Sequence, residues 1–138
     1  MRLTTAILLG AAFLPTAFPA QAFTTAAEVR PILSATKSAW IAVREFEGND
    51  LLYFTHLESW RCGLEGVKYG INSDVADRVW ELETCYEGEA APNAMKAEDR
   101  LPYVTLPLGS VESVTIEILY DDGTSDSALY ERADVMTP

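Results

Sequence analysis

Hydrophobic and polar residues alternate over much of the chain with a period of two, which is typical of β-strands with one buried face. The pattern is clearest over residues 113–120. Asp121-Asp122-Gly123 then has the composition of a hairpin turn, so residues 127–135 are predicted to return as the last strand. The positions predicted to point into the core are Val114, Ile116, Ile118 and Tyr120.

A first hairpin is predicted from residues 40–46 and 51–60, on either side of the turn-forming residues 47–50. The aromatic and threonine content of residues 51–60 favours a strand. The same segment also fits a helix that begins after Asp50. In that alternative one helical face would carry Tyr53, Leu57, Trp60 and Leu64.

A second hairpin is predicted from residues 67–71 and 79–84, around the polar turn 72–77. If Ile71 lies opposite Arg78, Cys85 falls opposite about Leu64 and comes within reach of Cys62. The open end of this hairpin is therefore where a disulfide would form.

Cys62 and Cys85 are the two cysteines of the chain. In an exported protein an even number of cysteines indicates disulfide bonding, and here one pairing exists. A bridge that closes a loop of about 24 residues stabilises a fold by roughly 3 to 3.5 kcal/mol. The spacing does not match a redox motif, and two cysteines with one histidine do not make a zinc site.

The remaining segments complete a mainly β fold. Thr25 and Glu28 have the spacing of a capping box, which predicts a helix over residues 26–36, with Pro31 as a kink or as its true start. Its buried stripe is predicted to be Val29, Ile32, Leu33 and Thr36. Residues 87–100 are a predicted loop, and 101–106 an edge strand because prolines flank it.

The fold class predicted from these elements is a small antiparallel β-sandwich or barrel with one short N-terminal helix after a cleaved signal peptide. The spacing of cysteine and tryptophan residues is not that of an immunoglobulin domain.

The N-terminal residues have the pattern of a secretory signal peptide. Arg2 supplies the positive charge, residues 6–14 form an apolar segment, and Ala20-Gln21-Ala22 ends in small residues, so cleavage is expected before Phe23. The apolar segment is shorter than the roughly 20 residues that span a bilayer. Residues 1–22 are thus predicted to be the signal peptide.

Residues 23–138 are predicted to form a single β-rich domain that is periplasmic or secreted, without membrane insertion after cleavage. Removal of residues 1–22, which contain one basic and no acidic residue, changes the net charge from −11 to −12. Such a charge disfavours nucleic acid and anionic lipid as partners. It attracts basic proteins, polycations or divalent cations, although an excess of carboxylates also simply keeps an exported protein soluble.

His56 is the single histidine, so a mechanism that uses imidazole depends on it. On a strand, Phe54 and Glu58 would share its face, and Glu58 would orient the ring. The nucleophile elbow Gly-x-Ser-x-Gly is absent. A small hydrolase is therefore the third hypothesis for function.

Glu81 and Glu83 are predicted to share a strand face close to Glu87 and Glu89, which suggests a cation-binding or paired-acid surface. The segment 121–126 is rich in aspartate but does not match an EF-hand loop.

Trp60-Arg61-Cys62 places an aromatic ring and a guanidinium beside the disulfide. We expect Trp60 to pack on the disulfide and Arg61 to lie outside; an exposed pair would instead form a binding patch. The weak candidate surface consists of Trp60, Arg61, His56, Glu81 and Glu83.

The leading hypothesis is an exported, non-enzymatic interaction or envelope accessory domain whose partner is another exported or envelope protein. A small-ligand or divalent-cation binding protein is the alternative. No catalytic residue, metal ligand or cofactor is assigned.

Overall fold

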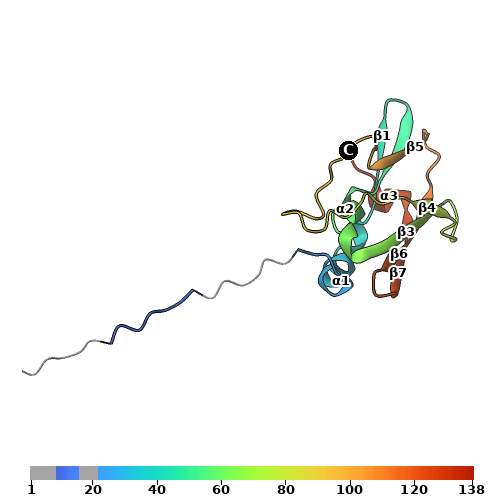
Figure 1. The fold of residues 1–138 in the computed structure, drawn as a ribbon. Coiled ribbons are helices and arrows are strands. Elements are labelled where there is room, and N and C mark those ends of the chain that lie inside the picture. The colour runs from blue at the N-terminus through green and yellow to red at the C-terminus, as the bar shows by residue number, and fades with distance from the viewer. Residues whose placement is uncertain (1–8, 16–21) are drawn as a thin grey trace, which may run out of the picture.

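Seven strands form two antiparallel sheets in the computed structural model, which describes residues 9–15 and 22–138. One sheet has the order β1 (Ala42–Phe46), β2 (Asn49–Tyr53) and β5 (Tyr103–Pro107). The other has the order β4 (Arg78–Trp80), β3 (Leu64–Ile71), β6 (Ser113–Tyr120) and β7 (Ser125–Glu131). The mainly β prediction is confirmed, and the two sheets (Figure 1) are consistent with a β-sandwich.

The helices are short. They are α1 (Ala26–Ala35), α2 (Thr55–Glu58) and α3 (Arg132–Val135), with the 3₁₀ turns η1 (Lys37–Ala39) and η2 (Arg61–Gly63). The predicted N-cap is present, since the Thr25 hydroxyl accepts a hydrogen bond from the Glu28 amide at 3.3 Å. Pro31 lies inside α1 without ending it. The predicted signal peptide falls largely on residues 1–8 and 16–21, outside the described residues.

The first hairpin is tighter than predicted. Glu47 and Gly48 both have positive φ, as a two-residue hairpin turn requires, so Asn49 and Asp50 already belong to β2. The strand predicted over 51–60 is correct as far as Tyr53 and wrong beyond it. The Phe54 amide donates to the Pro102 carbonyl at 2.8 Å, and the chain then turns into α2.

The second hairpin has a different register from the predicted one, since Tyr69 rather than Ile71 lies opposite Arg78. The turn is longer because it folds back over Gly70, where a Cβ would lie 2.1 Å from the Val75 carbonyl oxygen. β4 ends at Trp80, not at residue 84. The disulfide between Cys62 and Cys85 is nevertheless confirmed, with the two Cα atoms 5.1 Å apart.

The predicted last strand is right to Glu131 and wrong over the residues that form α3. A capping box between Glu131 and Asp134 starts this helix. The following residues run along β1, where the Thr137 amide donates to the Val43 carbonyl at 2.8 Å. Figure 1 shows this end of the chain beside β1.

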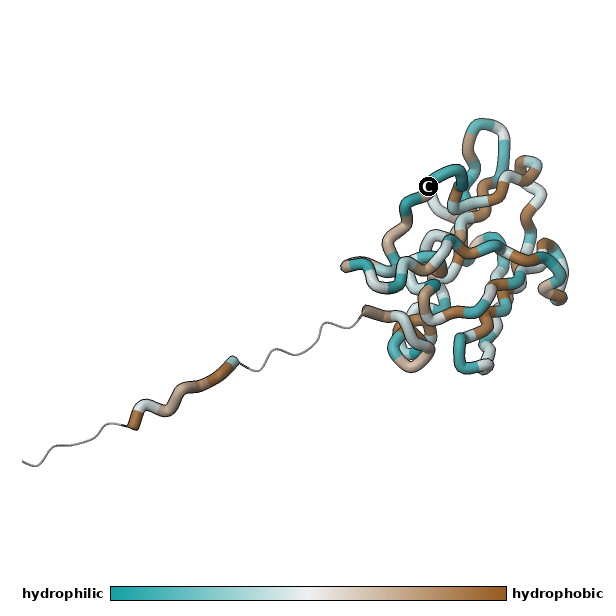
Figure 2. The backbone as a smooth tube through the Cα atoms, in the orientation of Figure 1, coloured by the Kyte–Doolittle hydropathy of each residue, from teal (hydrophilic) through white to brown (hydrophobic). Residues whose placement is uncertain are grey.

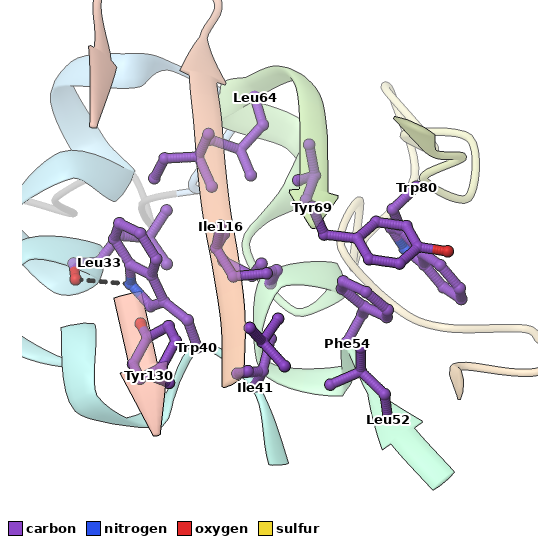
Figure 3. Packing of buried hydrophobic residues seen from close by; sticks show 14 of the residues in the cluster. Leu33, Trp40, Ile41, Leu52, Phe54, Leu64, Tyr69, Trp80, Ile116 and Tyr130 are labelled. Atoms are coloured by element: carbon purple, nitrogen blue, oxygen red, sulfur yellow. Dashed lines mark hydrogen bonds between the residues drawn. The ribbon is translucent and has the colours of Figure 1, made fainter. Parts of the chain in front are cut away.

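The core lies between the two sheets and under α1. All four positions predicted to point inward on β6 are buried. Figure 2 shows hydrophobic residues concentrated along the strands and polar residues at the turns. In Figure 3, Phe54 lies against Trp80, with ring centroids 4.2 Å apart, and the Trp40 indole donates to the Leu33 carbonyl at 2.9 Å. The first contact joins the end of β2 to β4 of the other sheet, and the second joins α1 to the chain just before β1.

Candidate functional site

A groove with a volume of about 590 Å³ lies between β1 and α2 and defines the candidate site. Its volume is within the range of roughly 300–1,000 Å³ that is common for ligand pockets. The side chains that give it chemical character are Trp40, Ile41, Arg44, Tyr53, His56 and Ser59.

Side chains repeat every two residues along a strand and about every 3.6 residues along a helix, which explains why these side chains meet. On β1 the core residue Val43 alternates with Arg44, which therefore points to the outer face. Tyr53 lies opposite Ala42 on the same face. On α2, His56 and Ser59 are three residues apart and so share a helical face.

His56 is held by the end of α1. The Thr36 hydroxyl has one proton, which it donates to the Ile32 carbonyl at 2.7 Å, so at 2.8 Å it accepts a hydrogen bond from His56 Nε2. We therefore assign the imidazole proton to Nε2 and the lone pair to Nδ1. Burial lowers the pKa of His56 below its ordinary value, and the ring is neutral at pH 7.

The groove lacks the arrangement of a hydrolase among the described residues. The Ser59 hydroxyl donates to the Thr55 carbonyl at 2.9 Å rather than to His56. The hydroxyl that does contact the ring, Thr36, gives its proton to backbone. Since an activated nucleophile has to donate to its base, the geometry does not support nucleophilic catalysis here.

An aromatic surface continues from the groove across the outer face of the sheet. Tyr53 and Tyr103 lie opposite each other on β2 and β5, with ring centroids 5.0 Å apart. The Arg44 guanidinium lies 4.8 Å from the centroid of the Phe46 ring, and Phe46 is 43% exposed. Among the strands of the described residues, β5 pairs with β2 alone, so its other backbone edge is unpaired in this sheet. We call this surface, from Arg44 and Phe46 to Tyr103, the tyrosine face.

Arg61 lies elsewhere and is buried, with 2% of its surface exposed. All three of its nitrogens donate to backbone carbonyls. The acceptors are the carbonyls of Glu58, Glu83, Thr84, Asn93 and Ala94, at 2.8 to 3.2 Å. The guanidinium thus joins the long loop before β5 to α2 and η2.

Two buried carboxylates complete this ionic cluster. Glu58 accepts from the Trp80 indole at 2.9 Å, from the Glu83 amide and from Arg100. Glu83 accepts from the Tyr86 hydroxyl at 2.6 Å and from two loop amides. Burial opposes ionisation of Glu83, but these hydrogen bonds outweigh it and lower its pKa. Both oxygens of Glu58 and one oxygen of Glu83 accept hydrogen bonds within the protein, which is the arrangement of a structural cluster.

These positions correct three expectations. Glu58 does not orient His56, because residues 55–58 are helical and side chains two apart point in opposite directions on a helix. Glu81 is exposed and Glu83 is buried, since the ladder ends at Trp80 and its alternation ends there. Arg61 is inside rather than outside.

Trp60 is half-buried and packs against Phe23 rather than lying in the core. The five residues of the predicted surface are therefore separated: His56 lies in the groove, Arg61 and Glu83 in the ionic cluster, Trp60 in a pocket with Phe23, and Glu81 is exposed. Arg44 and Tyr53 were missed, although the alternation of β1 and β2 already placed both on an outward face.

The carboxylates of the turn before β7 also accept hydrogen bonds from the protein. Asp121 accepts from the Ala26 amide at 2.9 Å, and hydrogen bonds from Thr124 lower the pKa of Asp122 to about 2. Within residues 9–15 and 22–138, no three His, Cys, Asp or Glu side chains are placed to hold a metal ion.

Comparison with known protein families, curated proteins and solved structures gave no match. None of the helices in the described part of the chain combines the length and apolar character that a membrane span needs.

Proposed function

We propose that this protein is an exported, non-enzymatic domain that binds another exported or envelope protein through the groove and the tyrosine face. The single observation that carries the proposal is that Arg44, Phe46, Tyr53 and Tyr103 share the outer face of one sheet, where Arg44 and Tyr53 also line the groove. Tyrosine, tryptophan and arginine are the side chains that contribute most to protein interfaces. The unpaired edge of β5 adds backbone donors and acceptors for an extended partner segment.

Export is supported by two independent features. The N-terminal sequence has the order of a signal peptide, and the Cys62–Cys85 disulfide belongs in an oxidising compartment such as a periplasm or the extracellular space. A partner that meets this domain would therefore be another exported or envelope protein.

Site-specific photo-crosslinking tests the proposal. A photoreactive amino acid replaces Phe46 or Tyr103 on the tyrosine face, and the matched control replaces Val79, which is 67% exposed on the other sheet. We expect a discrete adduct from the two tyrosine-face positions and none from the control. Excess unlabelled protein should suppress that adduct, and Tyr53→Ala should weaken it. Equal adducts from all three positions, or none, would contradict the proposal.

The volume of the groove favours a small ligand as the second candidate. A small ligand would contact the groove residues Tyr53 and His56 but not Tyr103, which lies outside the groove. Tyr103→Ala therefore separates the two candidates. It should weaken binding of a protein partner and leave binding of a small molecule in the groove unchanged, as measured by calorimetric titration.

A further inference from the structure

Phe23, the residue before which cleavage is expected, has an unusual backbone conformation. Its φ angle is +53°, in the left-handed region that bulky residues rarely adopt. The angle φ is defined by the carbonyl carbon of the preceding residue. When the peptide bond between Ala22 and Phe23 is cut, that constraint no longer exists. Cleavage at this bond therefore removes a local strain from the fold.

The nitrogen of Phe23 already lies beside a carboxylate. It donates to Glu28 Oε2 at 3.2 Å, while the other oxygen of Glu28 accepts from the Thr25 hydroxyl at 2.9 Å. As an amide, this nitrogen has one proton to donate. As a free terminus it carries a positive charge and three protons, so the same contact becomes an ion pair.

The rest of Phe23 is also held. Its ring lies edge-on to Trp60, with centroids 5.2 Å apart, in a pocket formed with residues 90–94. Its carbonyl accepts from Asn93 Nδ2 at 2.9 Å. The Asn93 amide is oriented by Cys62, whose backbone N–H donates to Asn93 Oδ1 at 2.8 Å. The disulfide region thus positions the groups that hold Phe23.

We propose that these residues form a binding site for the processed N-terminus, in which Glu28 holds the free ammonium group of Phe23 and Trp60 holds its ring. The inference rests on the proposed export. A signal peptidase adds water across the Ala22–Phe23 amide, so that the C–N bond breaks. Ala22 leaves with a carboxylate, and the amine of Phe23 takes up a proton. Maturation of the chain then completes the fold at this site.

The charged groups around this terminus are few. Glu28 is on α1, and Asp121, from the β6–β7 turn, binds the amide of Ala26 at the start of the same helix. The facing loop residues 90–94 are uncharged. Arg61 on η2 is also close, and its guanidinium donates to the carbonyls of Asn93 and Ala94. The Glu28 carboxylate contacts the nitrogen itself, so it favours the ammonium form and raises the pKa of the terminal amine above its ordinary value of about 8. The stabilisation is therefore fully present below about pH 8 and is lost at higher pH, as the ammonium group gives up its proton.

The test compares the thermal midpoint of three forms: residues 23–138 with a free amine, the same chain acetylated at its terminus, and residues 20–138. We expect the free-amine form to melt higher by about 3 °C at pH 7. Most of this difference comes from the ion pair and is lost by about pH 10, whereas the smaller part that comes from the φ angle of Phe23 does not depend on pH. In Glu28→Gln, which keeps a partner for Thr25, the difference at pH 7 should fall to the part that does not depend on pH. Equal midpoints of the wild-type forms across this pH range would overturn the site.

A mass measurement on the protein exported from the full-length precursor provides the second readout. We expect a chain that begins at Phe23, and a different first residue would overturn the proposal. A precursor that stays intact inside the cell would contradict export itself. If the chain is exported with a different first residue, or if the midpoints are equal, only this terminus site is contradicted. Neither result affects the crosslinking test of the proposed function.

Discussion

Arg61 illustrates how a single residue decides local structure in this protein. Its charge suggested a surface position, yet it is buried and donates to the carbonyls of five residues from separate segments. Those carbonyls belong to backbone without regular pairing, so water or a side chain has to satisfy them. The guanidinium fits because its donors point in several directions within one plane.

Replacement of Arg61 by Met should destabilise the fold by about 3–5 kcal/mol, because it leaves several buried carbonyls without a donor and removes one of the two cations beside the buried Glu58 carboxylate. Arg61→Lys should recover only part of this loss, since an ammonium has three donors. Urea denaturation followed by tryptophan fluorescence measures the change. Arg78→Met, at an exposed position of β4, is the control. A loss below about 1 kcal/mol in Arg61→Met would show that the cluster is not structural.

At the scale of elements, Asp50 joins three parts of the chain. Its carboxylate on β2 accepts from the Gly109 and Val111 amides before β6 at 3.0 and 3.1 Å. It also forms a two-pronged ion pair with Arg132 of α3 at 2.6 and 2.9 Å. Asp50 is fully buried, although the sequence placed it in the predicted turn 47–50. The carboxylate thus fixes where β7 ends and α3 begins.

The hydrogen bonds from Arg132, with those from the two amides, hold the pKa of Asp50 well below its ordinary value despite its burial. A lowered pKa in the folded state means that the unfolded state takes up the proton first as the pH falls. The stabilisation is therefore present above about pH 4 and is lost below it. Asp50→Asn should cost about 2–3 kcal/mol at pH 7 and make the decrease in stability between pH 5 and pH 2 shallower than in the wild type. Parallel pH profiles of the two proteins, from denaturant unfolding, would refute this.

The helix α1 and the turn η2 are in close contact at Gly63. A Cβ on Gly63 would lie 2.3 Å from a Val29 methyl group and 2.7 Å from the Thr25 carbonyl oxygen. Gly63→Ala should therefore push α1 outward and destabilise the protein by about 1–3 kcal/mol. Gly66→Ala is the matched control, because a Cβ there meets no atom within 4 Å. Circular dichroism during thermal unfolding measures both, and equal midpoints for the two variants would contradict this account of the packing.

Over the whole molecule, the disulfide links η2 to the beginning of the loop that Arg61 holds. The bridge and the guanidinium therefore constrain the same region, one by a covalent bond and the other by hydrogen bonds. The bridge limits the freedom of the unfolded chain, and the hydrogen bonds stabilise the folded one. Phe23 and Trp60 contact the same region, so the proposed terminus site depends on both the disulfide and Arg61.

Replacement of Cys62 and Cys85 together by alanine should reduce the free energy of unfolding by about 3 kcal/mol, given a sequence separation of 23 residues. The wild type under reducing conditions should show a similar loss. Urea denaturation of the three samples gives the comparison. A double variant as stable as the oxidised wild type would contradict the stabilisation that we assign to the bridge through the unfolded chain.

The sequence by itself determined the features whose cause is local. The alternation of residues 113–120 and the cap at Thr25 depend on residues that are neighbours in the chain. The chain has two cysteines, so their pairing has one solution. All of these are present in the structure.

Only the tertiary structure decided the features that depend on distant segments. The turn into α2 follows from the contact of Phe54 with Pro102, the register of β3 and β4 from the turn over Gly70, and the burial of Arg61 from carbonyls more than twenty residues away. The groove is also of this kind, because η1, β1, the end of β2, α2 and the residues Thr137 and Pro138 line it together. Periodicity indicates which face of an element is outward, but not which other element will face it, since that choice minimises the free energy of the whole chain.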